Sequence, residues 1–165
     1  AVPANASLEM KKAITELPAL FPMFSAQPLL RIFWQNTLVL LIAMLLGGIS
    51  FSVFGLILVM ITMVIAGFGS AFLLNTGLVT PTILAGFYLP HSLFEIPAIL
   101  LASAAVLRSG AMLAVPDREK TIGEVWLLSL ADWAKIMIGA VLPLLLVGAA
   151  LEAWVTLPSV PALFR

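Results

Sequence analysis

An apolar run extends almost unbroken from Leu29 to Leu74, and it constrains the fold more than any other feature of the sequence. A helix crosses a bilayer with about 20 residues, so this run is long enough for two spans. Its one clear interruption is the Gly-Gly-Ile-Ser-Phe-Ser sequence at residues 47–52. We therefore expect one spanning helix over about residues 28–46 and a second over about residues 53–74.

The composition of the whole chain supports a membrane domain. Hydrophobic residues make up 62% of the 165 residues and charged residues 10%, whereas soluble domains average roughly 45–50% and about 25%. A water-soluble enzyme and a disordered tail are excluded as descriptions of the whole chain. Eight Lys and Arg residues balance eight Asp and Glu residues, so no basic surface is available for nucleic acid. The absence of cysteine excludes disulfides and thiolate metal sites.

Three further apolar segments follow the first two. The segment at residues 79–89 is short, since eleven residues of helix rise only about 17 Å, and the next covers residues 92–115. Thr121 and Glu124 have the spacing of a capping box, and the last span is expected over about residues 136–155. The prediction is an all-α, polytopic transmembrane helical bundle of about five spans, with one short or kinked segment.

This bundle is predicted to occupy residues 28–158. Residues 1–27 are expected to form an N-terminal amphipathic or interfacial segment, in which residues 7–21 have the apolar spacing of an amphipathic helix that lies either in the plane of the membrane or on the inner face of the domain itself, and residues 159–165 a short tail. With five spans and a cytoplasmic N-terminus, seven basic residues lie inside and only Arg165 lies outside. This asymmetry predicts a multi-pass protein of the cell membrane with its N-terminus in the cytoplasm. The seven are Lys11, Lys12, Arg31, Arg108, Arg118, Lys120 and Lys135.

A resemblance to a known family emerges from residues 89–98, Leu-Pro-His-Ser-Leu-Phe-Glu-Ile-Pro-Ala, and from the alanine-rich stretch that follows to Gly110. They resemble the signature of the stage II sporulation protein M family, which has Pro-His-Gly, then Glu and Ala, then a helix of small residues. Ser92 stands here in place of the usual Gly. Other positions fit the family pattern in the same order, namely Asn36, Asn75, Gly77, Pro90, Thr156 and Pro158.

The resemblance covers about residues 28–158. It implies an integral membrane protein that works with partner proteins, because relatives in sporulating bacteria act in cell-wall remodelling during engulfment. Many relatives in other bacteria and in archaea have no assigned activity.

Ionisable residues inside a membrane are costly and tend to face a bundle interior or a cavity. His91 and Glu95 are four residues apart and share one helix face, which Ala98, Ala102 and Ala105 continue as a packing face. The five-span topology places His91, Glu95 and Glu152 together near the outer side. It places Asn36, Asn75 and Arg108 in the inner half.

Three interpretations of His91, Glu95 and Glu152 remain open. They form a hydrogen-bonded staple between helix ends, a relay for protons or a solute, or a metal site, since one His and two carboxylates can bind zinc. We expect the staple, with no metal and no other cofactor. The sequences His-Glu-x-x-His and Gly-x-Ser-x-Gly are absent, and we expect no enzymatic activity.

The favoured function is a subunit or scaffold of a membrane protein complex. Its expected partners are the lipid bilayer and other membrane proteins, including a second copy of the chain, and not nucleic acid. Small residues four apart on the second helix, Gly67 with Ala71 and Ala66 with Ser70, are expected to pack within the chain, with a dimer face as the alternative. The alternative function is a small permease with a polar path at His91, Glu95 and Glu152.

Overall fold

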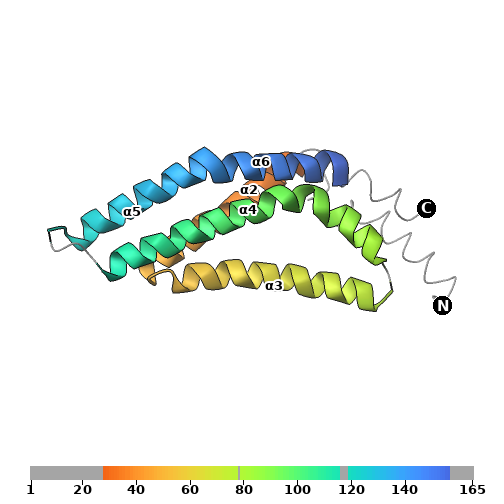
Figure 1. The fold of residues 1–165 in the computed structure, drawn as a ribbon, viewed down its shortest axis with the longest axis horizontal. Helices are drawn as coiled ribbons and strands as arrows, with labels where there is room; N and C mark the ends of the chain where they lie inside the picture. Colours follow the sequence, from red (N-terminus) through yellow and green to blue (C-terminus); the bar gives the residue numbers. More distant parts are fainter. Residues whose placement is uncertain (1–27, 78, 116–118, 157–165) are drawn as a thin grey trace.

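The computed structural model describes residues 28–77, 79–115 and 119–156, which form four long helical rods (Figure 1). Each rod is long and apolar enough to cross a membrane, and the described residues contain no strand. The protein is therefore an all-helical membrane bundle. The first three rods are α2 (Pro28–Ile49), α3 (Val53–Asn75) and α4 (Pro81–Ala114); the fourth joins α5 (Ile122–Ile136), η2 (Met137–Val141), α6 (Leu142–Leu151) and η3 (Glu152–Thr156).

The turn between α2 and α3 falls where the sequence predicts it. Phe51 and Ser52 both adopt left-handed backbone conformations, with φ of 50° and 78°, which non-glycine residues rarely occupy. The buried Ser52 hydroxyl donates a hydrogen bond to the carbonyl oxygen of Val106 on α4, at 2.6 Å. This bond offsets part of the backbone strain and fixes the turn against α4.

Helices α2 and α3 approach each other closely at Gly55. A Cβ atom at this position would overlap the carbonyl oxygen of Ala43 and would lie 3.1 Å from the backbone of Gly47. The absence of a side chain lets the two backbones meet, as small residues commonly do between membrane helices.

The third and fourth expected segments are one continuous helix, so the described residues contain four candidate spans and not about five. Thr80 caps α4 by accepting a hydrogen bond from the backbone of Ile83, and Pro81 lies in the first turn. Pro90 and Pro97 lie inside the helix, where each removes a backbone hydrogen bond without ending it. Figure 1 shows that α4 bends in this region, which is the usual effect of proline on a membrane helix.

The fourth rod begins with the capping box that the sequence predicts, formed by Thr121 and Glu124. It then runs without a break to Thr156 and contains two π-helical segments, η2 and η3. Such wide turns are rare in helices and often occur at functional sites.

The middle of α4 forms the centre of the bundle, packed by α2 and α6. Ala98, Ala102 and Ala105 are at most 4% exposed, and Val141 and Leu145 of the fourth rod are equally enclosed. In contrast, most of α3 is exposed on the surface of the bundle. Its small residues Ala66, Gly67 and Ala71 are exposed and nothing in the described chain lies within 4 Å of a Cβ atom built on Gly67. The expectation of packing within the chain is therefore wrong for these three residues, whereas the fourth, Ser70, is half-buried and its hydroxyl donates a hydrogen bond to Tyr88 of α4 over 3.1 Å.

Four rods place the start of α2 and the end of η3 at the same end of the bundle (Figure 1). We call this the α2-start end. Among the described basic residues, Arg31 lies in the first turn of α2 at this end, whereas Arg108 lies toward the far end of α4 and Lys120 directly precedes α5. The seven-to-one asymmetry thus depended on a fifth span. Residues 1–27 and 157–165, including the expected amphipathic helix, the tail and Pro158, lie outside the described residues.

Candidate functional site

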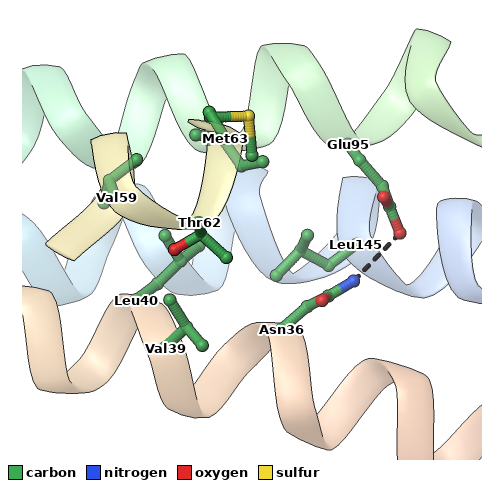
Figure 2. A pocket seen from close by; sticks show the side chains of 9 residues that line it. Asn36, Val39, Leu40, Val59, Thr62, Met63, Glu95 and Leu145 are labelled. Atoms are coloured by element: carbon green, nitrogen blue, oxygen red, sulfur yellow. Dashed lines mark hydrogen bonds between the residues drawn. The ribbon is translucent and has the colours of Figure 1, made fainter. Parts of the chain in front are cut away.

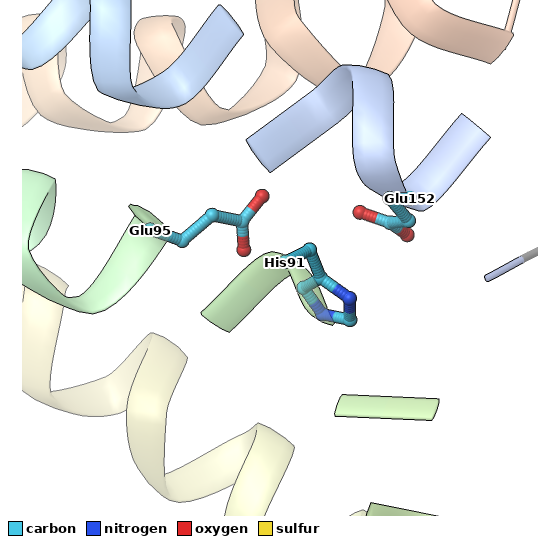
Figure 3. Close-up of side chains that lie close together, drawn as sticks. All are labelled: His91, Glu95 and Glu152. Carbon is cyan, nitrogen blue, oxygen red and sulfur yellow. The ribbon is translucent and has the colours of Figure 1, made fainter. Parts of the chain in front are cut away.

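Three ionisable side chains meet near the α2-start end of the bundle. His91 and Glu95 come from α4 and Glu152 is the first residue of η3. One ligand-type atom from each residue lies within 4.8 Å of the other two. Figure 3 shows the carboxylates of Glu95 and Glu152 approaching from either side of the His91 imidazole. We call these three residues the His-Glu-Glu cluster.

The His91 side chain is enclosed by its own helix and its neighbours and is 5% exposed. Its ring lies 6.0 Å from that of Phe87 and 5.9 Å from that of Tyr88, measured between centroids. The Tyr88 hydroxyl is in turn 3.1 Å from the Ser70 hydroxyl of α3. The Nδ1 atom of His91 is buried without a hydrogen-bond partner among the described residues, which is costly for a polar atom.

Asn36 of α2 joins the cluster through its amide. Its Nδ2 atom donates a hydrogen bond to Oε1 of Glu95 over 2.9 Å (Figure 2). The expectation that Asn36 and Glu95 lie in opposite halves of the membrane is wrong. It relied on five spans, whereas the continuous α4 brings His91 and Glu95 to the end at which α2 begins.

Helix α6 leaves room for Glu95 at Gly148. A Cβ atom on Gly148 would lie 2.7 Å from Cγ of Glu95. Gly148 precedes Glu152 by four residues, one helical turn, so the same stretch of the fourth rod admits one carboxylate and supplies the other. Sequence analysis did not identify Gly148, because its role depends on how closely α6 approaches α4.

A cavity of about 100 Å³ adjoins the cluster between the four rods. Asn36 and Glu95 lie at one end of it, as Figure 2 shows. Thr62 is the other polar residue of its lining, and the rest is aliphatic or methionine: Val39, Leu40, Val59, Met63, Ile99 and Leu145. A volume of this size holds roughly three water molecules, and no sequence signal indicated it.

The remaining described positions of the family pattern lie outside the His-Glu-Glu cluster. Asn75 is the last residue of α3, and Gly77 has a φ of 69° in the turn that follows. Pro90 lies inside α4, and Thr156 is the buried last residue of η3. Arg108 lies near the opposite end of α4 from Glu95, so the expectation that it shares one half of the membrane with Asn36 is wrong. It forms a 2.9 Å ion pair with Asp132, which also pairs with Lys135 over 3.0 Å.

The fold and this site define a polytopic helical membrane protein with a part-buried ionisable cluster between its spans. The chain belongs to the stage II sporulation protein M family, because the model of that family matches residues 9–157. No curated protein and no solved structure is significantly similar to the chain.

Proposed function

We propose that this chain is a non-enzymatic membrane subunit that holds a membrane protein complex together, with α3 as the helix that contacts a partner. The observation that carries the proposal is the exposure of α3. Only 6% of the 18-residue apolar stretch of α3 is buried, whereas 28–39% of the corresponding stretch is buried in each of the other three rods.

The kind of residue exposed on α3 supports a protein neighbour as well as lipid. Ala66, Gly67 and Ala71 form a surface of small residues on an otherwise bulky apolar helix. Small residues let the backbone of a second helix approach closely, and lipid chains make no such backbone contacts with this surface. The partner is a membrane helix from another protein or from a second copy of this chain.

The short connections support the same role. Residues 50–52 join α2 to α3, and residues 76–80 join α3 to α4. Between residues 28 and 156 the chain has no segment long enough for a domain outside the bilayer. Within this range, interactions between helices are the main means by which it can act on other proteins.

A photo-reactive amino acid at Phe68 tests the proposal, with the same substitution at Leu100 of α4 as the matched control. Both side chains are well exposed, at 74% and 64%. We expect crosslinks to a protein from position 68 and crosslinks to lipid alone from position 100. Mass spectrometry of the adduct identifies the partner, and lipid adducts alone from both positions would contradict the proposal.

The alternative is a small permease with a path past the His-Glu-Glu cluster, and the adjoining cavity is the observation that favours it. The packing beyond the cavity argues against a through-path, because Ala102, Ala105 and Val106 are buried in close contact there. Proton flux into liposomes separates the two functions. A flux that Glu95→Gln abolishes would support the permease.

We further propose that the protein resides in the cell membrane with its N-terminus in the cytoplasm. The first span usually dominates orientation. Lys11, Lys12 and Arg31 precede or begin α2, whereas the α2–α3 turn contains no charged residue. With four spans, the end of η3 then lies on the cytoplasmic side as well.

A further inference from the structure

The His-Glu-Glu cluster combines the donor types that bind divalent transition metals. An imidazole nitrogen and carboxylate oxygens are together a common ligand set for zinc. The sequence supplied these residue types, but His91 and Glu152 are 61 positions apart and only the fold brings them within 4.8 Å.

Charge balance within the cluster also requires a positive partner. Neither Glu95 nor Glu152 has an ion pair with Lys or Arg in the part of the chain that the structure describes. Two carboxylates so close together between membrane helices repel each other, and both are partly buried and have lost part of their solvation. Either protons or one divalent cation can neutralise them, and a neutral imidazole beside two carboxylates matches a charge of +2.

The unpartnered Nδ1 atom of His91 favours a divalent cation over protons as the neutralising charge. Protonating the glutamates removes their charge but, with the side chains in their present positions, leaves the buried Nδ1 without a partner. A metal ion engages the imidazole and both carboxylates together. A ligating histidine can use either ring nitrogen, so the cluster can present a nitrogen to the ion without moving α4.

The distances suit one ion after small side-chain adjustments. Ligands of a tetrahedral zinc ion at about 2.1 Å lie about 3.4 Å from one another. Rotation of the flexible glutamate side chains closes the difference from 4.8 Å. Asn36 then orients the Glu95 carboxylate by its 2.9 Å hydrogen bond, as residues around a metal commonly do for its ligands.

We propose that His91, Glu95 and Glu152 form a binding site for one divalent transition-metal ion of the zinc class, which ties α4 to η3 within the membrane. A fourth coordination position is left for water. The proposal does not depend on the scaffold function, since an ion that links two spans of one chain needs no partner protein.

The test begins with the tag-free parent protein in detergent, stripped of metal and titrated with Zn²⁺ under competition from excess Mg²⁺. We expect one Zn²⁺ per chain and a higher unfolding temperature when it is bound. Glu95→Gln, Glu152→Gln and His91→Ala should each weaken Zn²⁺ binding at least about 100-fold, and Asn36→Ala about 10- to 100-fold with unchanged stoichiometry. Asp132→Asn removes a carboxylate far from the cluster and is the matched control.

A spectroscopic measurement on the parent keeps the test decisive if a variant does not fold. The chain has a single histidine, so nitrogen coupling from an imidazole in the electron paramagnetic resonance spectrum of bound Cu²⁺ identifies His91 without any substitution. We expect this coupling. Failure of the parent to bind Zn²⁺ stoichiometrically, or Cu²⁺ binding without imidazole coupling, would overturn the proposal.

Discussion

The Cγ atom of Glu95 lies 2.7 Å from the point at which a Cβ atom would stand on Gly148. This contact joins the bent part of α4 to α6 and brings one carboxylate into the interior beside the other. Any side chain at position 148 must displace Glu95 from its present place. The glycine is therefore part of the site although it carries no functional group.

Gly148→Ala is expected to destabilise the bundle by roughly 1–3 kcal/mol, as overpacking does in a closely packed interior. Thermal unfolding in detergent measures the change. Gly139→Ala is the matched control on the same rod, because nothing lies within 4 Å of a Cβ atom there. It should be neutral or slightly stabilising, since alanine favours a helix more than glycine does. Equal effects of the two substitutions would show that Gly148 is not a contact point.

Asn36→Ala should cost roughly 1–3 kcal/mol of stability, because it leaves the part-buried Glu95 without its hydrogen-bond donor. Gln35→Ala changes the neighbouring, exposed amide and should cost well under half as much. The same unfolding measurement compares the two variants. A Gln35→Ala variant as unstable as Asn36→Ala would mean that α2 is weakened generally and that the bond to Glu95 contributes little.

Sequence reasoning located helix boundaries best where a few adjacent residues mark them. The Gly-Gly-Ile-Ser-Phe-Ser sequence marks the α2–α3 turn, since two adjacent glycines and two serines interrupt an otherwise apolar run. It is wrong about residues 90 and 91, where a break was expected between the segments at residues 79–89 and 92–115, because α4 continues through Pro90 and on past Pro97. A proline costs a helix one bond and a kink, and in a membrane the continuing packing of α4 against its neighbours outweighs that cost.

Only part of the candidate site could be predicted from the sequence. The spacing of four between His91 and Glu95 places them on one face whatever the fold, and heptad spacing places Ala98, Ala102 and Ala105 there too. The contact of Asn36 with Glu95 depends on how many spans separate α2 from α4, so one miscounted span placed Glu95 on the opposite side of the membrane from Asn36. The room at Gly148 depends on how closely α4 and α6 approach, which no local pattern encodes.

Ala102→Leu tests the packing face of α4. Ala102 is 1% exposed, and a leucine there should overpack the contact at a cost of roughly 1–3 kcal/mol. Leu100→Ala, at a position 64% exposed, is expected to have little effect on thermal stability in detergent. If Leu100→Ala is the more damaging substitution, the buried and exposed faces of α4 have been assigned the wrong way round.

The four-rod topology makes its own prediction about the chain ends. An even number of spans returns the end of η3 to the side on which α2 begins, and nine further residues to Arg165 are too few to cross a bilayer. A reporter fused after Arg165 should therefore be active in the same compartment as a reporter placed before α2. Under the proposed orientation that compartment is the cytoplasm.

A third fusion within residues 116–118, between α4 and α5, is the control and should report the opposite compartment. Opposite compartments for the two chain ends would mean that a further segment crosses the membrane, restoring the five-span arrangement that the charge pattern of the sequence first favoured.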